Sequence, residues 1–92
     1  MKQLSFIIIN YNTADLTVKC IDSIKRFSNF KHEIIVVDNG SLDESISRIR
    51  DSFSDVKVVK NDENVGFAKA CNKGFNESEG SLICFLNSDA EL

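Results

Sequence analysis

The 92-residue sequence has room for one small domain, and its composition, 42% hydrophobic and 27% charged, is ordinary for a globular protein. Its formal net charge of −3 argues against a nucleic-acid-binding surface, which needs a basic patch. No apolar run approaches the roughly 18 residues of a membrane-spanning helix. The first apolar run ends at Asn10, too short for a secretory signal, so we expect a cytoplasmic protein. Three widely spaced cysteines without metal-site spacing predict buried, reduced thiols: Cys20, Cys71 and Cys84.

The first quarter of the chain predicts a strand and a helix. Residues 4–9 are rich in isoleucine, which is typical of a buried strand. Asn12 can cap the helix that follows. Apolar residues then recur at spacings of four, four and three, as on one face of a helix: Leu16, Cys20, Ile24 and Phe27.

Two further strands and a second helix are predicted next. A β-branched run at residues 33–38 ends in a carboxylate, Asp38. Ser41 and Glu44 have the spacing of a capping box, which indicates the start of a helix. Residues 56–59 form a short third strand.

The last third of the chain predicts a third helix and a fourth strand. The helix has an apolar face, and Gly80 is placed as its C-cap. The strand covers residues 81–86. The helix face consists of Phe67, Ala70, Cys71, Gly74 and Phe75.

The order β-α-β-α-β-α-β indicates a parallel sheet with right-handed crossovers and helices on its faces. We therefore expect an α/β, Rossmann-like fold with strand order 3-2-1-4. No linker-like stretch interrupts residues 1–92, which we take as a single domain.

Polar residues follow three of the predicted strands. They are Asn10-Tyr11-Asn12, Asp38-Asn39 and Asn87-Ser88-Asp89. In open parallel sheets ligands bind just beyond the carboxyl ends of the strands. Carboxylates there can accept hydrogen bonds from a base or ribose, or hold Mg²⁺ or Mn²⁺ against a diphosphate. A strand-terminating polar turn is the alternative, and the glycine-rich phosphate-binding motifs of dinucleotide-binding folds and P-loop proteins are absent from the sequence.

Four motifs in order resemble the inverting family 2 glycosyltransferases, which have a nucleotide-sugar-binding GT-A fold. Residues 6–12 are similar to the first strand and nucleotide-contacting turn of the family, and residues 33–41 to its second strand and loop. Residues 64–74 resemble a segment of the rhamnosyltransferase-like members, and residues 86–89 fall where the family has its D-x-D motif. The chain thus resembles the N-terminal half of a GT-A enzyme.

The resemblance implies a role for each strand end. Tyr11 and Asn12 would lie at the nucleotide, and Asp38 would contact a uracil or thymine base. Asn87 stands at the first acidic position of D-x-D, where it would hydrogen-bond the ribose or diphosphate, and Asp89 would hold Mg²⁺ or Mn²⁺. Tyr11 is equally compatible with an aromatic residue at the edge of the core.

The implied reaction is transfer of a sugar, hexosyl or rhamnosyl, from a UDP- or dTDP-sugar to a glycan or lipid-linked glycan, with inversion. The family places its general base beyond the D-x-D motif, so no catalytic residue is assigned and we expect the 92-residue chain alone to be inactive. The longer enzyme would act in the cytoplasm or at the inner face of the membrane.

A non-catalytic nucleotide-binding or interaction module is the alternative function. A nucleotidyltransferase would need a glycine- and lysine-rich loop after the first strand, where Tyr11-Asn12-Thr13 stands. The fourth strand would be an exposed sheet edge, which predicts pairing between copies of the chain.

Overall fold

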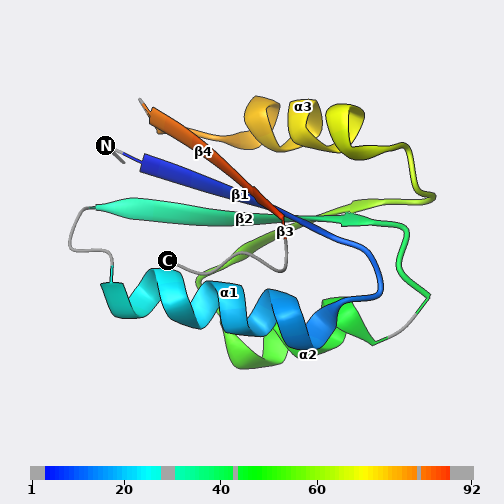
Figure 1. Cartoon of the computed structure of the whole chain (residues 1–92), viewed down its shortest axis with the longest axis horizontal. Coiled ribbons are helices and arrows are strands. Elements are labelled where there is room, and N and C mark those ends of the chain that lie inside the picture. Colours follow the sequence, from blue (N-terminus) through cyan, green and yellow to red (C-terminus); the bar gives the residue numbers. More distant parts are fainter. Residues whose placement is uncertain (1–3, 28–30, 43, 81, 88–92) are drawn as a thin grey trace.

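The computed structural model describes residues 4–27, 31–42, 44–80 and 82–87, without the side chains of Phe27 and Asn87. The strands pair in parallel in one sheet of order β3-β2-β1-β4, which confirms the predicted α/β topology and strand order. The elements alternate along the chain (Figure 1): β1 (Leu4–Asn10), α1 (Ala14–Phe27), β2 (His32–Asn39), α2 (Ser45–Ser52), β3 (Lys57–Asn61), α3 (Phe67–Glu77) and β4 (Leu82–Asn87).

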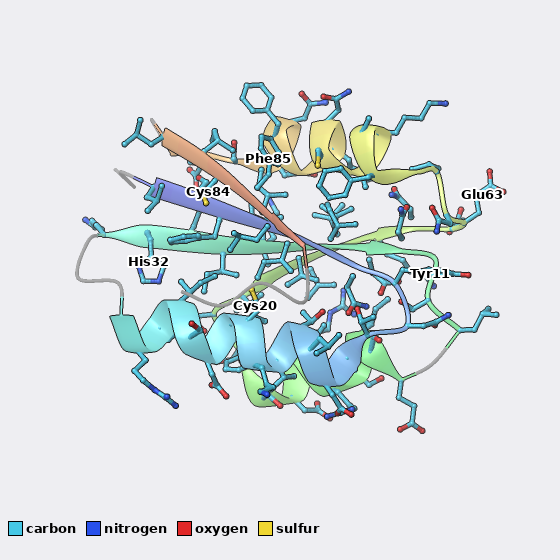
Figure 2. All side chains as sticks on the ribbon, in the orientation of Figure 1. Tyr11, Cys20, His32, Glu63, Cys84 and Phe85 are labelled. Atoms are coloured by element: carbon cyan, nitrogen blue, oxygen red, sulfur yellow. The ribbon has the colours of Figure 1, made fainter. Side chains whose placement is uncertain are left out.

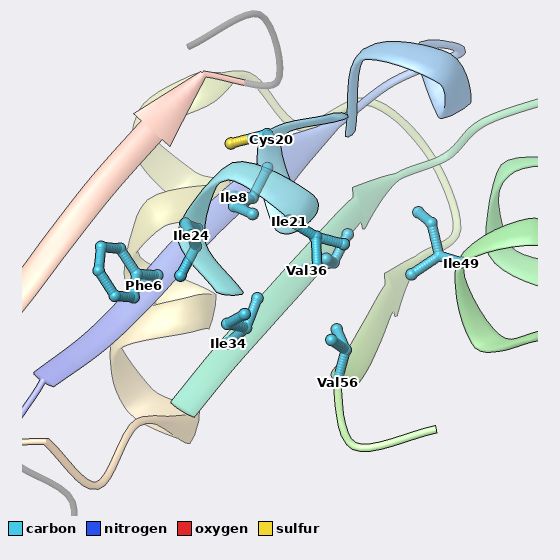
Figure 3. Packing of buried hydrophobic residues seen from close by; sticks show 9 residues of the cluster. All are labelled: Phe6, Ile8, Cys20, Ile21, Ile24, Ile34, Val36, Ile49 and Val56. Carbon is cyan, nitrogen blue, oxygen red and sulfur yellow. The ribbon is translucent and has the colours of Figure 1, made fainter. Parts of the chain in front are cut away.

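The sheet is the middle layer of three, with α1 and α2 on one face and α3 on the other (Figure 1). Successive residues of a strand point to opposite faces, so the central strands must be apolar on both. On β1, Ile8 belongs to the cluster under α1 and α2, and Ile7 to the cluster under α3. Figure 3 shows the first cluster, from Phe6 to Val56.

The face of α1 that packs on the sheet differs by one position from the predicted one. Leu16 is exposed, whereas Ala14, Thr17 and Ile21 are buried beside the predicted Cys20 and Ile24. The positions 14, 17, 21 and 24 have the helical spacing of three, four and three. A search for apolar residues alone misses this face because position 17 is a threonine.

On α3 the small residues of the predicted face meet the sheet, and the partly buried Cys71 packs against the same cluster. Ala70 and Gly74 are buried, while Phe67 and Phe75 are exposed. A Cβ at Gly74 would lie 2.4 Å from Cγ2 of Ile7, so the helix lies too close to β1 for any side chain there.

Neither predicted cap of α1 and α2 forms as expected. The carbonyl of Thr13 accepts the first α1 hydrogen bond, from Thr17 N at 2.9 Å, so the helix starts one residue later than a cap at Asn12 requires. Glu44 precedes α2 without a side-chain cap, and Ser41 has other partners, so the predicted capping box is wrong. Both side chains are used at the site described below.

Gly80 is not the C-cap of α3. The helix ends at Glu77, with Ser78 as its C-cap. Gly80 N donates to the hydroxyl of the buried Ser5 at 2.9 Å, and that hydroxyl donates to Glu33 at 2.6 Å. These bonds tie the approach to β4 to the first residues of β1 and β2.

β4 lies at the sheet edge, beside β1, as the order 3-2-1-4 predicts. Its Leu82 and Phe85 are exposed. All three cysteines are free thiols, but only Cys20 is fully buried. No helix within the described ranges is long and apolar enough to cross a membrane.

One surface ion pair joins α1 to the turn before β3. Lys25 Nζ lies 2.6 Å from a carboxylate oxygen of Asp55, whose side chain is largely exposed. The hydrogen bond from Lys25 lowers the pKa of Asp55 below its ordinary value of 3.8. A pKa lowered by folding stabilises the folded state above the unfolded pKa, and this stabilisation is lost as pH falls through the folded pKa.

We expect Asp55→Asn to lower the free energy of unfolding by less than about 1 kcal/mol at neutral pH, because the pair is exposed to solvent. The difference from the wild type should shrink as the pH falls below 3.8 and disappear below the lowered pKa of the folded state, where the wild-type carboxyl is also neutral. Urea unfolding at neutral and acid pH measures both, with Asp62→Asn in the exposed loop after β3 as control. If Asp55→Asn remained less stable than the wild type by the same free energy in acid, this account would be contradicted.

Candidate functional site

The carboxyl ends of β1, β2 and β3 meet at one edge of the sheet. In register, Asn10 pairs with Asp38, and Asn39 pairs with Asn61. The turns that follow these strands, residues 11–13, 40–42 and 62–66, therefore lie at the same edge. This is the edge at which an open parallel sheet binds ligands.

The side chain of Asn10 is the centre of the first polar cluster. Its Nδ2 donates to Asp38 Oδ1 at 2.8 Å and to Ser41 Oγ at 3.1 Å. Its Oδ1 accepts from the hydroxyls of Thr17 at 2.5 Å and Thr13 at 3.2 Å. Asn10, Asp38 and Thr17 are fully buried, so one side chain joins β1, β2 and the start of α1 inside the fold.

Asp38 holds the loop after β2. Its Oδ1 accepts from Ser41 Oγ at 2.7 Å, and its Oδ2 accepts from Ser41 N at 3.0 Å. Ser41 Oγ in turn accepts from Asn12 N at 2.9 Å, and Asn12 Oδ1 accepts from Leu42 N at 2.7 Å. The turns after β1 and β2 are thereby tied to each other.

Asn39 points to the opposite face of the sheet and organises a second cluster. Its Oδ1 accepts from Asn61 Nδ2 and Val65 N, both at 3.1 Å. Its Nδ2 donates to Asn64 Oδ1 at 3.0 Å and to the carbonyl of Gly66 at 3.4 Å. Since Asp38 and Asn39 are consecutive, one strand end fixes a turn on each face of the sheet.

Two glycines at this edge have backbone angles that favour glycine. Gly40 has φ +82°, and a Cβ there would lie 2.7 Å from the backbone of Glu63. Gly66, directly before α3, has φ +89°, and a Cβ there would meet nothing within 4 Å. Gly40 therefore lets residues 40–42 and 62–66 touch, whereas Gly66 serves only the turn.

The predicted nucleotide-binding residues differ in exposure. Tyr11 is 42% exposed and lies at the end of the molecule that also carries Glu63 (Figure 2). Asn12 is exposed and has φ +53°, in the left-handed region that asparagine tolerates. Asp38 is fully buried, and its predicted contact with a base stays a prediction.

The predicted residues of the D-x-D-like segment are described only in part. The backbone of Asn87 pairs with Ile9 in the parallel ladder, which places this residue at the same sheet edge. Its side chain, and the whole of Asp89, lie outside the described residues. Within the described part of the chain, no three metal-ligating side chains of His, Cys, Asp or Glu come together.

A pocket of about 250 Å³ opens beside Asn12, between the start of α1 and α2. Arg48 of α2 borders it and forms an ion pair with Asp15 of α1, with 2.6 Å between the charged atoms. The pocket reaches the exposed side of the turn after β1. Its lining consists of Asn12, Thr13, Ala14, Asp15, Leu16 and Arg48.

Sequence reasoning missed Thr17, Ser41 and the side-chain role of Asn39. Thr17 was detectable as a polar residue inside the helical stripe of α1. Ser41 was assigned to a helix cap because its spacing from Glu44 fits one. Which partner a short polar side chain chooses depends on loop positions that the sequence pattern does not contain.

Comparison with known proteins gives one consistent result. Residues 5–92 match the model of glycosyl transferase family 2. Glycosyltransferase AglE of Haloferax volcanii is 32% identical over 91 residues, which are 94% of this chain and 30% of that protein. The teichoic acid poly(glycerol phosphate) polymerase of Staphylococcus epidermidis is 32% identical over 96 residues, covering this whole chain but 13% of that protein.

Solved structures agree. The mannosyltransferase PcManGT of Pyrobaculum calidifontis, in complex with GDP-Man and Mn²⁺, superposes with a TM-score of 0.87 at 27% identity over 97% of this chain and 28% of that one. S. aureus TarS 1-349 in complex with UDP gives a TM-score of 0.78 at 26% identity, over 95% of this chain and 27% of that one. The chain spans less than a third of each of these relatives. Since the family model covers nearly its whole length, the chain belongs to the family 2 glycosyltransferases.

Proposed function

We propose that the chain is the donor-binding part of an inverting glycosyltransferase that uses a UDP- or dTDP-sugar. The observation that carries this proposal is the joining of the turns after β1, β2 and β3 into one hydrogen-bonded platform at the ligand-binding edge of the sheet. The GDP-Man and UDP complexes of the two similar solved proteins support a nucleotide-sugar ligand.

The exposed part of this platform is suited to a nucleoside. Tyr11 offers an aromatic face on which a base can stack, which buries apolar area of both rings. Asn12 is exposed beside it, and its backbone is held by Ser41. We propose that these two residues contact the nucleotide, and that Asn87, at the end of β4, bonds the ribose or diphosphate.

We also propose that Asp89 holds a divalent cation, Mg²⁺ or Mn²⁺, at the donor diphosphate. A bound cation of this kind offsets the charge of a diphosphate. The Mn²⁺ in the mannosyltransferase complex supports this assignment. The residues of the described part contribute no metal cluster of their own, so the proposal depends on Asp89.

The acceptor is proposed to be a glycan or a lipid-linked glycan. The similarity to a teichoic acid poly(glycerol phosphate) polymerase supports a polymer as the kind of product. Transfer of a hexosyl or rhamnosyl group with inversion rests on the motif resemblance. The cytoplasmic location and the pairing of copies through β4 stay predictions.

Calorimetric titration of the chain with UDP, dTDP and GDP, each with and without Mn²⁺ or Mg²⁺, tests the donor site. We expect saturable binding that weakens by about tenfold or more when EDTA is added, because the diphosphate charge is then unbalanced. Asp89→Asn should cause the same loss, while Asp22→Asn, at an exposed position on α1, should not. If nucleotide affinity changed neither on addition of EDTA nor in Asp89→Asn, the metal assignment would be refuted.

The alternative is a non-catalytic nucleotide-binding or interaction module. An assay of the longer protein that contains this chain distinguishes this alternative from the enzyme. The assay measures release of the nucleoside diphosphate from a sugar donor. Binding with no release in the presence of acceptor glycans would favour the module. Release that is lost in Asp89→Asn would favour the enzyme.

A further inference from the structure

We infer that Asn10 and Asp38 form a buried amide–carboxylate clamp that positions the nucleotide-contacting turn, and that Asp38 acts through this clamp without touching the base. The statement about the nucleotide rests on the proposed function. The clamp itself rests on the hydrogen bonds and burial of the two side chains. Asp38 is then a positioning residue.

The amide of Asn10 has no hydrogen-bonding capacity left for a ligand. A side-chain amide has two N–H donors and an oxygen with two lone pairs. Asn10 uses all four, with Asp38, Ser41, Thr13 and Thr17 as partners. Its side chain is fully buried, so its only effect on a ligand is through these partners.

The carboxylate of Asp38 is likewise closed to solvent. It accepts three hydrogen bonds, from Asn10 Nδ2, Ser41 Oγ and Ser41 N. A buried carboxylate is stable only when such donors replace its water. A base could reach this fully buried carboxylate only if the surrounding turn, which Ser41 holds, opened.

The clamp reaches the exposed surface through Ser41. The Ser41 hydroxyl donates a hydrogen bond to Asp38 and accepts one from the backbone N–H of Asn12. Asn12 then accepts from the backbone of Leu42, which closes a ring between the two turns. The left-handed backbone of Asn12, at φ +53°, is held within this ring, directly after the exposed Tyr11.

An exchange of the two side chains separates positioning from direct contact. Asn10→Asp alone sets a second buried carboxylate against Asp38, so donors are lost and like charges repel. Asp38→Asn alone leaves two amides facing each other and removes the charge. The double substitution Asn10→Asp/Asp38→Asn restores one amide and one carboxylate. The threonine hydroxyls can then donate to the carboxylate at position 10, and the amide at position 38 can donate to the same carboxylate.

We expect each single substitution to weaken UDP binding by about tenfold or more, and the double substitution to return it to within about threefold of wild type. If Asp38 contacts the base, the carboxylate at position 10 cannot replace it, and the double variant will bind as poorly as Asp38→Asn. That result would overturn the inference. Should Asn10→Asp fail to fold, the comparison of Asp38→Asn with the double variant still decides.

Amide hydrogen exchange, measured by NMR without nucleotide, tests the clamp independently. The amide protons of Asn12 and Leu42 should exchange faster in Asp38→Asn and recover protection in the double variant. Ser5→Ala is the matched control, because Ser5 is an equally buried hydroxyl at the opposite end of β1 and should leave both amides and UDP affinity unchanged. Unchanged protection in Asp38→Asn would refute the clamp.

The two measurements keep the clamp and the proposed function apart. If the wild-type chain binds none of UDP, dTDP or GDP, the proposed function fails, while the exchange of Asn12 and Leu42 still decides whether the clamp exists. A third outcome is that the wild type binds a nucleotide and amide protection is lost in Asp38→Asn and recovered in the double variant, but the double variant still binds UDP weakly. In that case Asp38 touches the base.

Discussion

Replacing Gly40 with alanine should lower the free energy of unfolding by about 2–5 kcal/mol. Two costs add at this position. The left-handed backbone, at φ +82°, disfavours any Cβ. The Cβ would also lie 2.7 Å from backbone atoms of Glu63, which cannot rotate away as a side chain would. The contact between the turns after β2 and β3 would have to open.

Gly66→Ala separates these two costs. Gly66 also has a positive φ, +89°, with ψ 162°, a region that is essentially restricted to glycine, but a Cβ there meets nothing within 4 Å, so only a conformational cost of about 1–3 kcal/mol applies. Urea unfolding of both variants measures the difference. Equal losses would show that the approach of Glu63 to Gly40 does not constrain the fold. Nucleotide affinity should fall in Gly40→Ala as well, because this loop carries Ser41.

Truncating Ile7 to alanine should cost about 2–5 kcal/mol, because this fully buried side chain fills the space between β1 and α3. Gly74 lies directly above it, where a Cβ would be 2.4 Å from Cγ2 of Ile7. Gly74→Ala should therefore destabilise the wild type by overpacking. In the Ile7→Ala background the contact with Cγ2 of Ile7 is gone, and only the contact of 3.1 Å with Cγ2 of Val37 remains, so the new methyl group can partly fill the cavity.

We thus expect Gly74→Ala to change sign, from destabilising in the wild type to stabilising in Ile7→Ala, with a coupling energy of about 1–3 kcal/mol. Ile8→Ala is the matched control, since Ile8 is the neighbouring buried residue on the other face of β1. There Gly74→Ala should have its wild-type effect. If the effects of Ile7→Ala and Gly74→Ala on the free energy of unfolding simply added, the close packing of α3 on Ile7 would be contradicted. Thermal or urea unfolding of the five variants and the wild type measures the cycle.

The topology of the sheet was predictable because its signals are local. Isoleucine-rich runs in β1 and β2 indicate strands buried on both faces, and the helices between them enforce parallel pairing. The order 3-2-1-4 followed from this alternation and from the family resemblance together, and it is confirmed. The faces of α1 and α3 were predicted less well. An apolar count favours Leu16 and Phe75, whereas contact with the sheet selects Thr17 on α1 and, from the predicted face of α3, Ala70 and Gly74.

The sequence predicted where the candidate site lies but not which hydrogen bonds its side chains form. Polar residues after β1 and β2 mark the edge of the sheet, and register brings Asn10 opposite Asp38. The sequence suggested that Ser41 caps a helix, and it did not indicate that Asp38 would be fully buried. In the fold Asp38 is fully buried, and Ser41 bonds the backbone of Asn12. Both outcomes depend on how closely two loops approach each other.

By itself, the sequence determined the strands, the parallel order and the sheet edge at which the polar residues gather, because hydrophobic periodicity and short connections are properties of neighbouring residues. Only the tertiary structure decided which polar groups became internal. Burial removes water from Asn10, Asp38 and Asn39, so each must find protein partners, and those partners come from turns distant in the sequence. Tyr11 and Asn12 stay exposed at this edge of the sheet, where we propose that they contact a nucleotide.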